Sequence, residues 1–283
     1  METLVNDLKH AFRMLRRSPA FTATAVSALA LGIGANTAIF SVVNTVLLKP
    51  LPFPEPDRIV QLMNRSPQGT FPGASVPKYN VWRAQDQVLE DVAAYDTGGP
   101  GINIAGGERP EQVEGIHVSR EFFRLFGAPV ILGRTFSHDE DRPRGDHVVV
   151  LSNGLWQRRF GSDASILGKA IALGGEPYTI IGVLGSGFAF DPAPDLYLPF
   201  QADPNSTQQA HYFRAAARLK TGVSLQTARA ALGLAAEEFK RKHPGTLGPN
   251  GSFSVDPMRE TIVRNVRTAL FVLLGAMRGP FLI

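Results

Sequence analysis

The sequence contains no cysteine among its 283 residues. This absence excludes a disulfide scaffold, a Cys-ligated zinc site, an iron–sulfur cluster and a thiol nucleophile. Charged residues are also scarce, at 19% of the chain, while there are 28 glycines and 21 prolines. The composition therefore indicates a chain with many turns, long enough for one or two domains with a buried core.

Familiar catalytic and nucleotide-binding motifs are missing as well. There is no P-loop, because the spacing over 161–169 is wrong and the following Ser or Thr is absent. There is no G-x-S-x-G and no H-E-x-x-H. The sequence therefore predicts no enzyme, no catalytic residue, no metal ligand and no cofactor.

One dense acidic run, His138-Asp139-Glu140-Asp141, interrupts this pattern. Because the run lacks the EF-hand spacing of calcium ligands, a solvated acidic turn is the favoured interpretation. A hydrolase that uses carboxylates such as Asp139 and Glu140 remains an alternative. The net charge of +4 comes from scattered basic residues without interleaved aromatics, so we expect no nucleic-acid partner.

The most informative feature is an uncharged run of 31 positions between Arg17 and Lys49. As a helix it would be about 46 Å long, more than the roughly 30 Å hydrocarbon core requires. We therefore predict a transmembrane helix over 18–48 and the lipid bilayer as a partner. A cleaved signal peptide, with A-x-A sites at 23–25 and 28–30, and a buried core helix are the alternatives.

Small residues recur four positions apart in this run, a spacing that lets a second transmembrane helix approach closely. The predicted helix-packing residues are Ala28, Gly32, Gly34 and Ala38.

Basic residues precede the run and lie beside an apolar arc of a predicted amphipathic helix over 1–17. They are Lys9, Arg13, Arg16 and Arg17. By the positive-inside rule they place the N-terminus in the cytoplasm and everything after Lys49 outside it.

A second apolar run, over 268–277, is too short to cross a bilayer before Arg278, Gly279 and Pro280 interrupt it. We expect residues 266–283 to be the first half of a second transmembrane segment, cut off.

Residues 49–265 predict a single globular block that begins with a stiff, proline-rich segment over 50–56. Apolar runs predict strands at 58–63, 147–151, 178–184 and 195–200. Periodicity and capping residues predict helices at 77–92, 119–126, 152–160 and 224–242. The expected fold class is α+β.

Several stretches resemble MacB/FtsX-like ABC transporter permeases, especially the orphan subgroup with a duplicated architecture. The most specific is VVVLSNGLWQRRFGSDASILGKAIALGGEPYTIIGVLGSGFAF (148–190). GRTFSHDEDRP (133–143), ARLKTGVSLQTARAAL (217–232) and the stretches over 7–60 and 269–277 are similar too.

The resemblance implies a bacterial inner-membrane permease subunit with a MacB-like periplasmic domain. That domain would have a mixed α/β porter part, over about 50–97 and 206–265, and a smaller β-rich insertion over about 98–205. A separate ABC ATPase subunit would supply energy for efflux or envelope transport, with a homodimer or a second permease half as a further partner.

The chain departs from the family after Met277, where the family continues with apolar residues. We therefore expect an incomplete permease. The alternative is a membrane-anchored periplasmic binding or assembly module that is not a transporter.

Overall fold

The computed structural model describes residues 13–43, 51–98, 101–105, 110–188, 190–191 and 193–264. The chain divides into two compact units, one formed by Met1–Pro50 with Ile262–Ile283 and the other by Leu51–Thr261. Each unit is described by itself.

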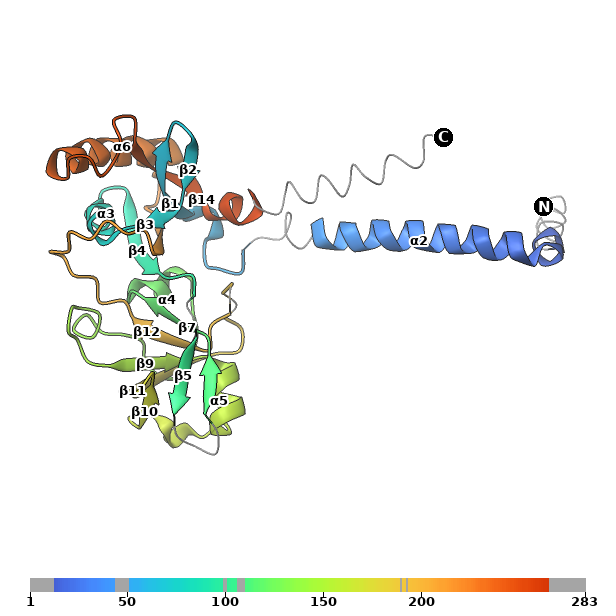
Figure 1. The fold of residues 1–283 in the computed structure, drawn as a ribbon, viewed down its shortest axis with the longest axis horizontal. Coiled ribbons are helices and arrows are strands. Elements are labelled where there is room, and N and C mark those ends of the chain that lie inside the picture. The colour runs from blue at the N-terminus through green and yellow to red at the C-terminus, as the bar shows by residue number, and fades with distance from the viewer. Residues whose placement is uncertain are drawn as a thin grey trace. The chain divides into compact units, whose positions relative to one another are not determined.

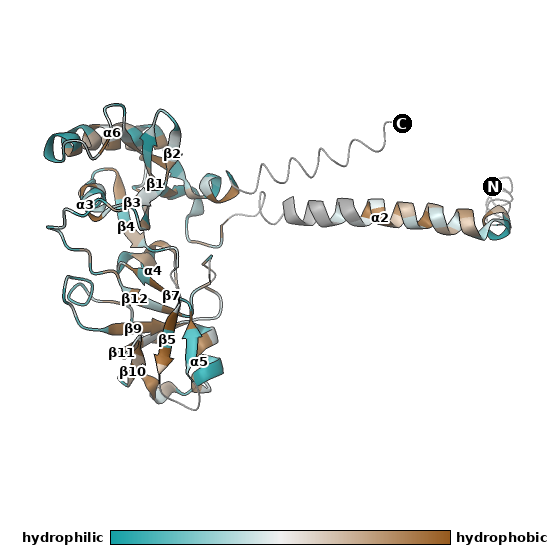
Figure 2. Ribbon diagram, viewed as in Figure 1, coloured by the Kyte–Doolittle hydropathy of each residue, from teal (hydrophilic) through white to brown (hydrophobic). Residues whose placement is uncertain are grey.

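The first unit contains helix α2 (Pro19–Val43). A helical stretch over 13–17 ends at Ser18, and Pro19 then occupies the start of α2, where its missing N–H costs nothing. Large apolar side chains are exposed along the helix, including Phe21 at 70% and Leu31 at 74%, and hydrophobic colour recurs along it in Figure 2. Residues 44–48 lie outside the described part.

A helix over 19–43 agrees with the predicted helix over 18–48, but its bilayer crossing is not confirmed. No helix in the described ranges combines the length and the hydropathy that a crossing requires. The transmembrane segment therefore stays a prediction.

The second unit is built on a sheet to which the described residues contribute 14 strands (Figure 1). Its main path runs β14-β1-β13-β4-β7-β12-β9-β11-β10-β5-β6, while β2, β3 and β8 pair with β1, β13 and β11. The β7–β12 and β9–β11 pairs are parallel and the others are antiparallel. The strands are β1 (Ile59–Ser66), β2 (Gly69–Phe71), β3 (Gly73–Ala74), β4 (Leu89–Tyr95), β5 (Ile102–Ala105), β6 (Glu111–Val113), β7 (Gly115–Val118), β8 (Val130–Gly133), β9 (Val148–Leu151), β10 (Ala170–Leu173), β11 (Glu176–Leu184), β12 (Leu196–Pro199), β13 (Phe213–Leu219) and β14 (Ser252–Pro257).

Two helices of this unit begin at serine caps. Ser152 and Ser224 each accept a hydrogen bond from a backbone N–H of the first turn, and Gly161 ends α5 in the left-handed conformation. The helical elements are η2 (Pro56–Arg58), α3 (Val76–Arg83), α4 (Glu121–Leu125), α5 (Asn153–Phe160), η3 (Ala164–Ile166) and α6 (Leu225–Lys242).

Buried apolar residues of the described part form three clusters along the sheet. The first lies under α3 and α6 and includes Trp82, Phe239 and Phe253. The second is rich in aromatic rings around Phe122 and Phe126. The third joins α5 to β9, β10 and β11.

The α+β class and the strands expected near 58–63, 147–151, 178–184 and 195–200 are confirmed. The helix expected over 77–92 is confirmed over 77–83 and is wrong beyond Arg83, because α3 ends there and β4 begins at Leu89. A turn closes at Gln85, whose carbonyl accepts the Leu89 N–H at 2.9 Å. Pairing with β13 then decides the conformation, since the helical spacing of the apolar residues is equally compatible with a buried strand.

Candidate functional site: a polar network where the chain enters the domain

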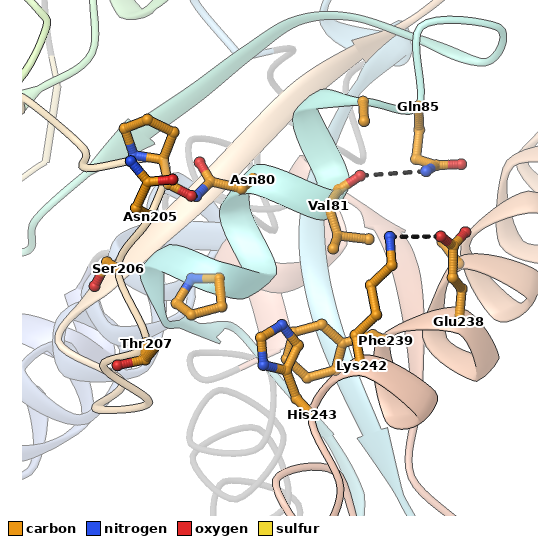
Figure 3. Close-up of a pocket in the computed structure, with 14 residues that line it drawn as sticks. Asn80, Val81, Gln85, Asn205, Ser206, Thr207, Glu238, Phe239, Lys242 and His243 are labelled. Atoms are coloured by element: carbon orange, nitrogen blue, oxygen red, sulfur yellow. Dashed lines mark hydrogen bonds and ion pairs between the residues drawn. The ribbon is translucent and has the colours of Figure 1, made fainter.

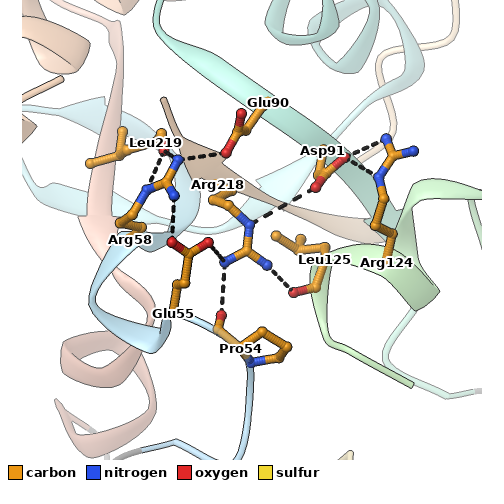
Figure 4. A network of polar contacts seen from close by, with 9 residues as sticks. All are labelled: Pro54, Glu55, Arg58, Glu90, Asp91, Arg124, Leu125, Arg218 and Leu219. Carbon is orange, nitrogen blue, oxygen red and sulfur yellow. Dashed lines mark hydrogen bonds and ion pairs between the residues drawn. The ribbon is translucent and has the colours of Figure 1, made fainter. Parts of the chain in front are cut away.

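A network of charged side chains and backbone carbonyls surrounds the first residues of the second unit (Figure 4). These residues, 51–58, connect the stretch after α2 to β1, and we call them the lead-in segment. The network joins this segment to β4, α4 and β13, which are distant in sequence. Its charged members are Glu55, Arg58, Glu90, Asp91, Arg124 and Arg218.

Arg218 lies at the centre, with only 6% of its side chain exposed. Its Nη1 donates to the Pro54 carbonyl at 2.7 Å, and its Nη2 donates to the Leu125 carbonyl at 2.7 Å. The Glu55 carboxylate lies 3.4 Å from Nη1 and the Asp91 carboxylate 3.9 Å from Nε. A single buried guanidinium thus ties the lead-in segment to α4, β4 and β13.

Arg58 makes a second connection between the same elements. Its Nε and Nη2 both donate to the Leu219 carbonyl, at 2.9 and 2.6 Å, and Nη2 also contacts the Glu90 carboxylate at 2.5 Å. Its Nη1 donates to Glu55 at 2.7 Å. This last hydrogen bond is the main reason that the pKa of Arg58 is raised above its ordinary value.

The third connection runs from Asp91 of β4 to Arg124 of α4, whose guanidinium donates to the carboxylate. This bond raises the pKa of Arg124. Asp91 has a positive φ of 51°, uncommon for a residue other than glycine. The β4–β13 register shifts between Ala216 and Arg218, as at a β-bulge, so the local irregularity aims both charged side chains into the network.

Apolar contacts hold the lead-in segment in the same place. The Phe53 and Phe126 rings meet edge to face, with centroids 4.9 Å apart. Gly127 follows α4 with φ of 66°, and a Cβ there would lie 2.4 Å from Cγ of Pro54. Glycine is therefore required at this position for two reasons, its left-handed backbone and the close approach of the proline ring.

The two ends of the domain lie next to each other. Val60, near the start of β1, pairs with Pro257, the last residue of β14. Ile59 and Met258 belong to the same buried cluster. The chain therefore enters β1 and leaves β14 at the same end of the sheet.

The sequence-predicted site residues lie elsewhere, on or before α2. Arg13, Arg16 and Arg17 are exposed, and Lys9 lies outside the described residues. Ala28 is exposed on α2, and a Cβ added to Gly32 or Gly34 would meet open space. The side chain of Ala38 lies outside the described part. Their roles in orientation and helix packing stay predictions.

The acidic run is organised for stability. The Arg134 guanidinium donates a hydrogen bond to each oxygen of the Glu140 carboxylate, at 2.7 Å each. This pairing lowers the pKa of Glu140 to about 2. Asp141 accepts the backbone N–H groups of Arg120 and Gln201 at 2.9 and 3.0 Å. No group of metal-ligating side chains occurs in the part of the chain that the structure describes. Glu140 is thus held ionised in an ion pair with Arg134.

Sequence reasoning missed the polar network. The one available signal is the Arg218 charge near the end of the otherwise apolar strand FRAAARL. Charged residues are rarely fully buried unless paired, so such a position would have suggested a partner. It would not have named Pro54 or Leu125, which lie 164 and 93 positions away in sequence.

Comparison with known proteins identifies the fold. A family model described as the MacB-like periplasmic core domain matches residues 22–234. The chain belongs to this family. The resemblance that the sequence alone indicated is confirmed at this level.

Named relatives agree. The chain is 32% identical over 164 residues, 56% of its length, to the macrolide export ATP-binding/permease protein MacB of Chromobacterium violaceum. Among solved structures, the periplasmic region of MacB from Actinobacillus actinomycetemcomitans matches with a TM-score of 0.55 at 16% identity, covering 79% of this chain and 98% of that one. The extracellular domain of the ABC-type transporter YknZ from Gram-positive bacteria matches with a TM-score of 0.50 at 19% identity, covering 70% and 99%. At these identities the structures establish the fold alone.

The aligned part spans about a quarter of the MacB relative's length. The chain thus carries a MacB-like periplasmic core domain.

Proposed function

We propose that the chain is part of an ABC-transporter permease subunit whose periplasmic domain changes conformation when a partner ATPase hydrolyses ATP. The observation that carries the proposal is the network around Arg218, which couples the lead-in segment to three other elements of the domain. Arg218 itself is buried and donates to carbonyls of both the lead-in segment and α4, so separating these elements costs free energy and motion at the lead-in segment would be passed on rather than absorbed.

The membrane anchor belongs to the same proposal. The 31 uncharged positions between Arg17 and Lys49 are long enough for a crossing if the helix continues to Leu48. Exposed Phe21 and Leu31 on α2 favour a lipid environment, because water would hydrate them unfavourably. The N-terminus would be cytoplasmic and the domain over 49–265 periplasmic, at the bacterial inner membrane.

The domain ends support this arrangement. Since the beginning of β1 pairs with the end of β14, the chain enters and leaves the domain at one end of the sheet. The segments over 18–48 and 266–283 flank the domain in the sequence, and both would enter the same bilayer. The porter part, about 50–97 and 206–265, and the insertion, about 98–205, belong to this proposal, as do a separate ATPase subunit and a homodimer or second permease half.

The cysteine-free sequence makes the topology directly testable. Leu234→Cys places a thiol on an α6 side chain that is 75% exposed, and Glu2→Cys places one near the N-terminus. A membrane-impermeant maleimide should label Leu234→Cys in intact spheroplasts and label Glu2→Cys only after lysis. Labelling of Glu2→Cys before lysis, or protection of Leu234→Cys, would contradict the proposed orientation.

A second experiment separates the permease from the alternative of a membrane-anchored binding module. Asp57→Cys reports on the lead-in segment, and Leu234→Cys serves as the control on α6. In solubilised native membranes that contain the partner ATPase, ATP should change the labelling rate of Asp57→Cys and leave Leu234→Cys unchanged. No response to ATP at Asp57→Cys would favour the binding module.

A further inference from the structure

The chain passes from β12 to β13 through residues 200–212, which we call the strap. Part of the strap lies beside α3, where Figure 3 shows Asn80 next to it. Asn80 Nδ2 donates to the Pro204 carbonyl at 3.2 Å. Ser75, the N-cap of α3, donates through Oγ to the Gln209 side-chain oxygen at 3.2 Å. Both contacts join groups that carry no charge, so neither depends on pH near neutrality.

The third contact between α3 and the strap joins two titratable groups. Lys78 is only 1% exposed, and its Nζ lies 2.7 Å from Nε2 of His211 and 2.7 Å from Oδ1 of Asn64. Among the described residues, no carboxylate forms an ion pair with this ammonium group. A buried cation is thus held by an amide oxygen and an imidazole nitrogen, and the imidazole belongs to the strap.

The contact requires the His211 ring to be neutral. An ammonium group can only donate, so Nε2 must offer its lone pair and the ring proton must be on Nδ1. A second proton on this pair of groups turns Nε2 into a donor, which removes the hydrogen bond and places two positive charges 2.7 Å apart. His211 is exposed, so protons from solvent reach its ring. Burial and the Lys78 charge both lower the pKa of His211.

Uncharged groups surround the His211 ring on its other sides. The Phe71 ring of β2 lies 5.5 Å away between centroids, and a Cβ on Gly73 of β3 would lie 3.1 Å from Cβ of His211. Tyr212, the next residue, has a pKa raised by burial, so it stays neutral in acid. In the part of the chain that the structure describes, Lys78 is the charged group that acts on the His211 pKa.

The other charged side chains of the neighbouring elements lie elsewhere. Arg65 of β1 and Arg214 of β13 each follow a buried residue on the α3 side, so they alternate to the opposite face of the sheet. Arg83 of α3 lies over the Tyr79 ring, 5.3 Å from its centroid. In the strap, the Asp203 carboxylate accepts a backbone N–H two residues further along at 2.9 Å. His211 is therefore the group at this contact whose charge changes in mild acid.

We propose that the Lys78–His211 contact is a proton-sensitive latch, which holds the strap against α3 at neutral pH and releases it when His211 is protonated. The contact between Asn80 and Pro204 does not titrate, so we expect the movement between Pro204 and β13, over 205–212. The latch depends on neither ATP nor transport, so it can succeed or fail separately from the permease assignment.

The test measures the distance between two spin labels on the full chain in lipid nanodiscs. Because the sequence has no cysteine, the labels attach only to Ala210→Cys, at an exposed position of the strap, and to Leu234→Cys on α6. Double electron–electron resonance should give one narrow distance distribution at about pH 8 and a second, displaced distribution at about pH 5. The ratio of released to held strap should rise at least about fivefold, since one titrating group changes it by up to about tenfold per pH unit. Its midpoint should lie below 6.5, the ordinary pKa of histidine.

Three variants assign the response to the latch. His211→Gln keeps an acceptor for Lys78 but takes up no proton, so its distance distribution should be the same at both pH values. Lys78→Met removes the opposing charge and should abolish the pH dependence as well. His138→Gln removes an exposed histidine of the acidic run and is the matched control, which should respond like the unmodified protein. Circular dichroism at the higher pH shows whether each variant is folded.

Three outcomes would overturn the proposal. The first is an unchanged distribution in the unmodified protein across this pH range. The second is a pH response that survives in folded His211→Gln or in folded Lys78→Met, either of which is sufficient if the other variant does not fold. The third is loss of the response in His138→Gln, because the proton would then act outside the latch.

Discussion

Replacing Arg218 with Met removes the centre of the polar network while keeping an unbranched side chain of similar reach. The Pro54 and Leu125 carbonyls each lose the N–H that contacts them at 2.7 Å. Asp91 loses a cation at 3.9 Å but keeps Arg124. The change therefore leaves two carbonyl oxygens without these donors in a site where the arginine side chain is only 6% exposed.

Leaving a buried acceptor without a hydrogen bond lowers the free energy of unfolding by about 1–3 kcal/mol for each group. The apolar stem of Met restores part of the packing, so we expect the free energy of unfolding to fall by about 3 kcal/mol in total. For a domain of this size each kcal/mol corresponds to a few degrees, which predicts a melting temperature lower by roughly 10 °C.

Arg229→Met is the matched control. Arg229 also donates to a backbone carbonyl, that of Val255 at 2.9 Å, and pairs with Asp256 at 3.0 Å, but its side chain is 45% exposed. Arg229 lies nearer the surface than Arg218, so its loss should cost less than the loss of Arg218, although Val255 and the Asp256 carboxylate that it contacts are themselves buried. Thermal unfolding of both variants of the full chain in nanodiscs measures the difference.

Amide hydrogen exchange adds a local readout. The Arg58 N–H donates to the Glu55 carbonyl at 2.9 Å in the lead-in segment. Its exchange rate should rise in Arg218→Met and stay the same in Arg229→Met. Equal melting of the two variants, or unaltered exchange at Arg58 in Arg218→Met, would refute the role of Arg218 as the link between the lead-in segment and the sheet.

Two further predictions concern pH. Because Arg134 holds the pKa of Glu140 near 2, the ionised carboxylate stabilises the fold above its ordinary pKa near 4.5, and this stability is lost as pH falls toward 2. Glu140→Gln should therefore lower the free energy of unfolding by up to about 3 kcal/mol at pH 7, as measured by thermal melts. An equal loss of stability at pH 3 would contradict this. Burial lowers the pKa of Lys78 to about 8, so its protonated form opposes folding and the free energy of unfolding should rise between about pH 8 and 10.5. Denaturant titrations at pH 7.5 and 10 should show this gain of up to about 3 kcal/mol in the unmodified protein and not in Lys78→Met. The same pH dependence in both proteins would show that Lys78 is not responsible.

Local patterns predicted the elements whose signals lie within a few residues. The stretch over 224–242 combines a Ser cap, a periodic apolar face and a Pro-Gly stop, and α6 spans Leu225–Lys242 with Ser224 as its cap. The apolar run near 148 predicted β9 for the same reason. The helix expected over 77–92 failed beyond Arg83 because Leu89 and Val92, three positions apart, would share a helix face, whereas an irregularity in the β4–β13 pairing places both in the same core cluster as part of a strand.

The sequence by itself determined what depends on composition and local order: a long uncharged segment before an α+β domain, the family resemblance, and a domain without recognisable catalytic motifs. Only the tertiary structure decided which charged groups meet. Arg218 and Pro54 are 164 positions apart, and Arg58 is 161 positions from the Leu219 carbonyl that it contacts. Such contacts arise from strand order and register, which place remote residues side by side only when the chain folds.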